Sequence, residues 1–385
     1  MSLEERNKVK ELKRKAIIKK TKGKFRDGSD EKLRFISGIY ELDKKAYSGF
    51  PRGRLIEFFG AEGSGKSVNA VIISANINRY NHDTGEIDPS YENPCSVWYG
   101  DLEDASTRSF EEPWGFFRNK YGNNVDYVCG GDVLCDNITD MINDDLYQLY
   151  VVDSTDKCYP QEILEGEYDK NDMGKKGKCL ARTCRKWQSA LAEAAYRNRD
   201  TPWRIPSIIF ISHATPIFAD PYGRWESEAG SKVKFYSSVR VYFSKNKVNK
   251  EDSADFGITK ITATFRKNKL NPPGTVANYF LGTGEGNMEL GQINNINPIF
   301  KDARDFDLIT EVKKGYSLYG EVYKTQKAIK DKMAEDPLFL AKMWQDCNNL
   351  IAGGVVELEV DVTQTDDYIE KERKGTLGIA QDSEI

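Results

Sequence analysis

Short apolar runs that end in polar or charged residues recur along much of the chain. The clearest are Leu149–Asp153 (Leu-Tyr-Val-Val-Asp) and Ser207–Ser212 (Ser-Ile-Ile-Phe-Ile-Ser). Runs that are short and apolar at almost every position are typical of strands buried on both faces of a parallel sheet. Stretches of helical composition, such as Gly174–Asn198, separate these runs. The pattern predicts an α/β fold, in which helices flank a mainly parallel, twisted sheet.

The same pattern places the other elements of this core. Further strands are expected at Arg54–Phe59, Cys95–Gly100 and Val125–Cys129, and helices at Ser67–Tyr80 and Asn137–Asp144. Three later runs alternate more between apolar and polar positions and predict an antiparallel extension of the sheet: Phe235–Phe243, Lys260–Arg266 and Val276–Gly282. Ligands of such folds gather at the carboxyl ends of the parallel strands.

The two ends of the chain differ from this core. Residues 1–34 are expected to form a basic helix and linker for subunit docking. The basic run Lys8–Arg26 is expected to contact either nucleic acid or a neighbouring subunit, and the sequence leaves both partners open. The core domain is expected at 35–290, and a small α-rich (α+β) domain at 291–352. Residues 353–385 are acidic and are expected to form a flexible tail.

Composition excludes several classes of protein. The chain has 385 residues and a net charge of −4, so its overall charge does not indicate nucleic-acid binding. Its seven cysteines are scattered without a C-x-x-C pair, and it has two histidines, which argues against a zinc site or a disulfide framework. No apolar run approaches the ~20 residues that span a bilayer, and the N-terminus lacks a secretory signal. We therefore expect a cytoplasmic protein.

The chemistry centres on a glycine-rich loop that matches G-x-x-x-x-G-K-[ST], the phosphate-binding loop of nucleotide hydrolases. Glycines let successive backbone N–H groups turn toward a phosphate, the lysine reaches the β- and γ-phosphates, and the last hydroxyl ligates Mg²⁺. A strand before the loop and a helix after it make an accidental match improbable. The loop consists of Gly60, Ala61, Glu62, Gly63, Ser64, Gly65, Lys66 and Ser67.

Carboxylates at the ends of two predicted strands extend this site. Asp153 ends the strand Leu149–Asp153 and is expected to hold the Mg²⁺ shell. Glu103 lies in the cluster Asp101-Leu102-Glu103-Asp104, directly after the strand Cys95–Gly100. A surface acid is the alternative interpretation of Glu103.

Several separate stretches resemble the bacterial RecA recombinases. Val151–Glu167 carries the Asp-Ser after its strand and a later Glu-Gly-Glu, and Met173-Gly174 and Arg185-Lys186 follow. Lys234-Phe235-Tyr236-Ser237-Ser238-Val239-Arg240 is similar to the family's Lys-Phe-Tyr-Ala-Ser-Val-Arg, and Arg266-Lys267-Asn268-Lys269 to its Val-Lys-Asn-Lys. The resemblance extends from about Ile36 to Ile351 and is strongest from Leu55 to Gly286. It implies a RecA-like ATPase core, and its divergence resembles that of phage-encoded relatives.

The resemblance implies roles for individual residues. Glu103 matches the catalytic glutamate that orients or activates the attacking water. Lys267 and Lys269 match lysines that reach across a subunit interface to the ATP phosphates, and Phe235 matches an interface aromatic residue. His213 stands where the bacterial family has Gln, in a position that senses the γ-phosphate and passes its state to the following loop.

Two loops are expected to line the DNA, at about Pro160–Lys178 and Ala214–Lys232. They offer cations for phosphate and apolar or aromatic side chains for bases. The candidate contacts are Ile163, Met173, Lys175, Lys176, Lys178, Phe218, Tyr222, Arg224 and Trp225. The second loop departs from the family's sequence, which leaves its individual contacts open.

The resemblance implies an ATP-dependent strand-exchange protein that forms a helical filament on single-stranded DNA and pairs it with homologous duplex. ATP and Mg²⁺ are the implied cofactors, and the partners are single- and double-stranded DNA, further copies of the chain, and single-strand-binding and loader proteins. The implied location is the bacterial nucleoid or the cytoplasm of a phage-infected host. A RecA-like hexameric ring motor or helicase is the alternative function. A nucleotide-binding scaffold without catalysis is disfavoured by Lys66, Glu103 and Asp153 together.

Overall fold

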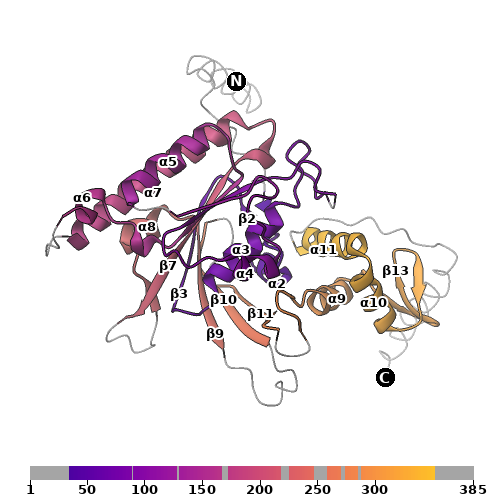
Figure 1. Ribbon diagram of the computed structural model, residues 1–385. Coiled ribbons are helices and arrows are strands. Elements are labelled where there is room, and N and C mark those ends of the chain that lie inside the picture. The colour runs from indigo at the N-terminus through magenta and orange to yellow at the C-terminus, as the bar shows by residue number, and fades with distance from the viewer. Residues whose placement is uncertain are drawn as a thin grey trace, which may run out of the picture. The chain divides into compact units, whose positions relative to one another are not determined.

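The computed structural model describes residues 34–88, 90–127, 130–166, 172–217, 225–246, 258–269, 274–284 and 288–351 (Figure 1). The chain divides into two compact units, Met1–Ile293 and Asn294–Ile385, which are taken separately below. Within the described ranges, no helix is both long and apolar enough to cross a membrane. The predicted N-terminal helix and acidic tail lie outside the described residues, and the predicted domain boundaries stay predictions.

A nine-stranded sheet forms the centre of the first unit, with strands in the order β11-β10-β9-β3-β7-β6-β4-β5 and β8 paired to β7. From β9 to β5 the neighbouring strands run parallel, whereas β10 and β11 add an antiparallel edge. The predicted α/β class is therefore confirmed. The strands are β3 Leu55–Gly60, β4 Val97–Asp101, β5 Asn124–Tyr127, β6 Leu149–Asp153, β7 Ser207–Pro216, β8 Trp225–Ser227, β9 Val239–Asn246, β10 Ile258–Asn268 and β11 Val276–Gly282.

Helices cover both faces of this sheet because its strands are apolar on both sides. Along β6, Leu149 and Val151 belong to one core cluster, which also contains side chains of α3, while Tyr150 and Val152 belong to the other, with α5 and α7. Figure 1 shows α5 and α7 side by side. The helices are α2 Tyr40–Lys45, α3 Lys66–Ile77, α4 Arg108–Glu111, α5 Gly131–Asn143, α6 Gln161–Leu164, α7 Asp172–Arg197 and α8 Gly230–Tyr236.

Short elements complete the unit. A two-stranded antiparallel sheet, β1 Arg34–Phe35 with β2 Phe50–Pro51, precedes β3. Three 3-10 turns lie at η1 Glu112–Trp114, η2 Thr155–Lys157 and η3 Pro202–Arg204.

The predicted strand Phe235–Phe243 was wrong at its start. Phe235 lies in α8, and the strand β9 begins at Val239. The helix ends at Ser237, whose backbone is extended (φ −59°, ψ 133°) and whose N–H donates to Val233 O. β9 also runs parallel to β3, so the antiparallel extension consists of β10 and β11 alone in the described part of the chain.

The second unit combines helices with a small sheet. Strands β12 Thr310–Val312, β13 Gly315–Leu318 and β14 Glu321–Tyr323 form an antiparallel meander, whose strands were not placed from the sequence. Helices α9 Ile296–Asp305, α10 Gln326–Glu335 and α11 Pro337–Ile351 accompany it. Met343 and Cys347 of α11 are fully buried at helical spacing, so this unit has its own core.

Candidate active site

The glycine-rich loop connects β3 to α3, as its sequence predicted. Gly63 and Gly65 have φ of +67° and +93°, a region in which residues with a Cβ are strained. A Cβ on Gly60 would lie 2.3 Å from Phe243 O, so only glycine fits where β3 passes β9. The loop therefore needs its glycines to bring backbone N–H groups and the start of α3 to one point.

Lys66 begins α3 and is almost fully buried. Its Nζ donates to Gly60 O at 3.0 Å and to Ala61 O at 2.9 Å, so the ammonium lies within the curve of the loop. Burial lowers the pKa of Lys66, while nearby carboxylates, Asp153 first among them, act in the opposite direction. The arrangement concentrates positive charge where a phosphate would lie.

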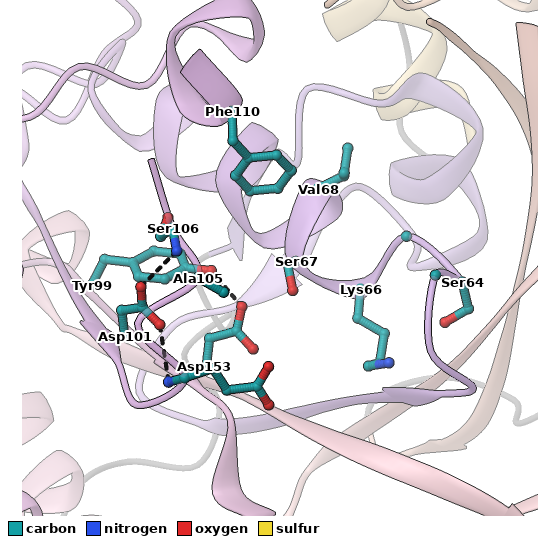
Figure 2. A pocket seen from close by; sticks show the side chains of 13 residues that line it. Ser64, Lys66, Ser67, Val68, Tyr99, Asp101, Ala105, Ser106, Phe110 and Asp153 are labelled. Carbon is teal, nitrogen blue, oxygen red and sulfur yellow. Dashed lines mark hydrogen bonds between the residues drawn. The ribbon is translucent and has the colours of Figure 1, made fainter. Parts of the chain in front are cut away.

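Ser67 and Asp153 both line the pocket. Tyr99 Oη donates to Asp153 Oδ2 at 2.7 Å from the next strand (Figure 2). Burial raises the pKa of Asp153, and the Ser67 and Tyr99 hydroxyls oppose that shift. A hydroxyl and a carboxylate are oxygen donors of the kind that Mg²⁺ prefers, so the pair fits the expected ion. The cavity measures about 320 Å³, within the range of about 300–1,000 Å³ typical of ligand sites.

Glu103 lies on the wall of the same cavity, in the turn after β4. Asp101 shapes this turn, because its carboxylate accepts from Glu103 N at 3.1 Å and from Ser106 N at 2.7 Å. Ser154 Oγ donates to Glu103 Oε1 at 2.6 Å from the end of β6. Glu103 is thus held on the pocket side of the turn, where a water beside the bound phosphates would be within its reach.

His213 lies beside both the loop and Glu103. It pairs with Gly60 across β7 and β3, and its Nε2 is 3.5 Å from Glu103 Oε1. The strand β7 continues past His213 to Pro216 and pairs with β8. The predicted strand end at Ser212 was therefore too early. His213 lies next to Ala214, where the pairing of β7 with β8 begins. Residues 218–224, between the two strands, lie outside the described part of the chain.

Sequence reasoning missed two residues of this site. Tyr99 is a buried strand residue, and nothing in the local pattern marks it as a partner of Asp153. Asp156 follows β6 in η2, and its Oδ2 accepts from His213 N at 2.7 Å. The position of Asp156, three residues after Asp153 at the end of a strand, could have marked it as a candidate. Its partner His213 lies on a different strand, so the contact itself could not be predicted.

A second group of predicted residues lies at the end of the sheet opposite to the phosphate loop, and it consists of Lys267, Lys269 and Phe235. Lys267 pairs with Arg240, and Lys269 N donates to Ser238 O at 2.9 Å, next to the amino end of β3. A rise of about 3.3 Å per residue along β3 puts roughly 16 Å between that end and Gly60. The fold therefore does not bring these lysines to the phosphate loop of their own chain.

This second group, here called the distal patch, consists of Phe235, Lys267 and Lys269. Phe235 is 69% exposed. Lys267 Nζ donates to Phe235 O at 3.0 Å, and Lys269 Nζ lies 6.0 Å from the Phe235 ring centroid. Burial and then the charge of Lys269 lower the pKa of Lys267. The patch presents an exposed aromatic ring beside two cations.

The expected DNA contacts are only partly described. Ile163 lies in α6, within the first predicted DNA loop. Lys175, Lys176 and Lys178 lie in the first turns of α7, in agreement with the helical stretch predicted at Gly174–Asn198, which overlaps the end of that loop. Trp225 begins β8, opposite Pro216. The side chain of Met173, and Phe218, Tyr222 and Arg224, lie outside the described residues.

Known proteins resemble this chain over most of its length. Residues 130–287 match the model of the RecA N-terminal domain. The chain is 25% identical to "Protein RecA" of Arthrospira platensis over 334 residues, which cover 86% of this chain and 82% of that protein. It is 24% identical to "Protein RecA" of Trichodesmium erythraeum over 371 residues, 92% of each chain. For "Protein RecA" of Ehrlichia chaffeensis the identity is 28% over 281 residues, 70% of this chain and 69% of the other.

Proposed function

The chain belongs to the RecA family, and we propose from this that it is an ATP-dependent strand-exchange recombinase. It would form a helical filament on single-stranded DNA and pair that strand with homologous duplex. Hydrolysis of ATP to ADP and phosphate would promote turnover of the filament. Base pairing supplies the recognition of sequence, so the protein needs no element that reads bases.

The candidate active site would bind ATP with its phosphates in the loop Gly60–Ser67. Ser67 and Asp153 would hold Mg²⁺, which offsets the charge of the phosphates when it is bound. Glu103 would orient the attacking water and accept its proton. Lys66 would keep its charge against the phosphates, because the surrounding carboxylates oppose the lowering of its pKa by burial.

The observation that carries the proposal is the separation of the phosphate loop from the distal patch. The two lie at opposite ends of the strands of one sheet. This separation supports the proposal that the lysines of one subunit would reach the phosphates of another. A contact that joins two different surfaces of the same chain is heterologous, and heterologous contacts build helical filaments or rings. The exposed Phe235 ring offers an apolar anchor for that contact.

A ring motor would use the same head-to-tail contact and is the second candidate. We favour the filament because the cations presented to the neighbouring site are Lys267 and Lys269, whereas a helicase would normally supply an arginine. DNA would lie along Ile163, Lys175, Lys176, Lys178 and Trp225, together with the expected contacts outside the described residues. Single-strand-binding proteins and loaders of the recombinase in the cytoplasm would be its further partners.

The test combines ATP hydrolysis with a joint-molecule assay. The purified chain is mixed with Mg²⁺ and ATP, with and without single-stranded DNA, and then with homologous or unrelated duplex. We expect DNA-stimulated hydrolysis and joint molecules with the homologous duplex only. Lys66→Ala serves as the control that lacks the phosphate-binding ammonium. Stimulated hydrolysis with strand unwinding and no homologous pairing would favour the ring motor.

A further inference from the structure

Asp156 connects the hydrolytic centre to the start of α7. Its Oδ2 accepts from His213 N at 2.7 Å and lies 4.0 Å from His213 Nε2. Its backbone oxygen accepts from Lys176 Nζ at 2.8 Å. One residue of η2 therefore contacts both the histidine beside Glu103 and a lysine of the predicted DNA-binding group.

The carboxylate of Asp156 is committed to His213. Its side chain is 14% exposed. Oδ2 accepts from His213 N and, at 3.4 Å, from Ser154 Oγ, whereas Oδ1 is buried and has no partner among the described residues. A carboxylate with one unpaired oxygen is costly to bury. The hydrogen bonds from His213 N and Ser154 Oγ and the nearby charge of Lys66 offset that cost. Removing the carboxylate leaves His213 N without this acceptor.

Lys176 is held at the other end of this connection. Besides its bond to Asp156 O, its Nζ lies 4.8 Å from the Tyr159 ring centroid. A phosphate of DNA would compete with the Asp156 carbonyl for the same ammonium, because a charged acceptor forms the stronger hydrogen bond. DNA at Lys176 would then release the backbone of Asp156.

We propose that Asp156 is a positioning residue that transmits DNA binding at Lys176 to Glu103 through His213. The inference rests on the proposed function and adds a residue and a route to it. The separation of 3.5 Å between His213 Nε2 and Glu103 Oε1 is at the outer limit of a hydrogen bond, so a small movement of His213 makes or breaks that contact. Freed from His213, Glu103 would turn to the attacking water.

The first test compares Asp156→Ala with Asp156→Asn. Alanine removes the acceptor for His213 N, whereas asparagine keeps an oxygen acceptor of the same size without the charge. At saturating single-stranded DNA we expect Asp156→Ala to lose about 50-fold of the DNA stimulation of hydrolysis, and Asp156→Asn to lose no more than about fivefold. The affinity for a fluorescent ATP analogue should stay within about threefold in both variants.

The second test uses the lysines of α7. Lys176→Ala should raise the rate of hydrolysis without DNA and reduce its stimulation by DNA, because the bond that DNA would release is already missing. Lys178→Ala, an exposed lysine two residues on, should raise only the DNA concentration needed for stimulation. The double variant Asp156→Ala/Lys176→Ala should keep as much DNA stimulation of hydrolysis as the less stimulated of the two single variants, because both changes interrupt one route. The lysine variants test the same route even if Asp156→Ala does not fold.

The outcomes separate this inference from the proposed function. If DNA stimulates hydrolysis equally in the parent and in Asp156→Ala, the inference is overturned and the proposed function stands. Three further outcomes would overturn the inference. The losses of DNA stimulation could be additive in the double variant, Lys176→Ala and Lys178→Ala could have equal effects, or Asp156→Asn could lose as much DNA stimulation as Asp156→Ala. A parent without any DNA stimulation would overturn the proposed function itself and this route with it.

Discussion

Glu103, which lines the phosphate pocket, lies beside His213, with 3.5 Å between Glu103 Oε1 and His213 Nε2. Glu103 comes from the turn after β4 and His213 from β7, and β6 lies between these strands. The proposed hydrolytic carboxylate is therefore adjacent to the strand that leads into the second predicted DNA loop. Under the proposed function, this contact would connect the nucleotide site to DNA.

Glu103→Gln tests the carboxylate directly. The amide keeps the size of the side chain but cannot accept a proton, so we expect hydrolysis to fall about 100-fold or more, while ATP binding persists because Lys66 and the loop are unchanged. The measurements are steady-state hydrolysis and the affinity for a fluorescent ATP analogue. Glu62→Gln, an exposed acid in the same loop, is the control and should keep most of the activity. Equal losses in the two variants would remove Glu103 from its proposed role.

Mixed subunits test whether the distal patch completes a neighbour's site. Lys66→Ala and Lys267→Ala/Lys269→Ala should each hydrolyse poorly alone, since one lacks the loop lysine and the other the cations supplied in trans. In an equal mixture, random assembly pairs an intact loop with intact lysines at about a quarter of the contacts, so about a quarter of the parental rate should return. Separate hydrolysis assays of each variant provide the baseline. A mixture as inactive as its components would show that the lysines do not act across subunits.

The elements that were predicted best are those decided by local composition. The strand Leu149–Asp153 has the predicted bounds because it is apolar throughout and buried on both faces, and no neighbour is needed to recognise it. The start of β9 was misplaced because it depends on pairing between Val239 and Ile56, which are far apart in the sequence. The short strands of the second unit were missed for the same reason, since their pairing partners define them.

The residues of the candidate site show the same difference between local signals and signals that depend on distant strands. Glu103 and Asp153 were identified because each follows an apolar strand, and the sheet order places both strand ends at one edge. Asp156 and Tyr99 were missed because their contacts depend on which strands are neighbours, and a single sequence does not encode that order.

Arg52 is a buried cation without a hydrogen-bonding partner in the described part of the chain. It is 5% exposed, its Nε, Nη1 and Nη2 have no partner, and burial lowers its pKa. The rings of Phe35 and Tyr80 lie 5.5 Å and 5.3 Å from its guanidinium carbon and offset only part of this cost.

Arg52→Met keeps the apolar stem and removes the charge, so we expect the free energy of unfolding to rise by about 1 kcal/mol or more. Denaturant unfolding measures the change. Arg204→Met is the matched control, because that guanidinium donates to His82 O and Asp83 and its loss should destabilise the protein. A destabilised Arg52→Met would indicate that the aromatic contacts outweigh the unpaired charge.

Asp43 should make the stability of the first unit depend on pH. Its carboxylate is fully buried in α2 and accepts from Ser37 N at 2.8 Å and 3.0 Å, and burial raises its pKa to about 8. The folded protein then holds a proton that the unfolded chain has released above its ordinary pKa of about 4. Stability contributed by this proton is complete below pH 4 and is lost as the pH rises toward 8, by up to about 1.4 kcal/mol per pH unit.

Asp43→Asn removes this titration and keeps an oxygen for Ser37 N. Denaturant unfolding of parent and variant at pH 6 and pH 8 isolates the effect, because the other groups titrate alike in both. We expect the difference in unfolding free energy to move in favour of Asp43→Asn by about 2 kcal/mol over this interval. Parallel pH profiles would mean that Asp43 is already ionised at pH 6, with the amide of Ser37 compensating its burial.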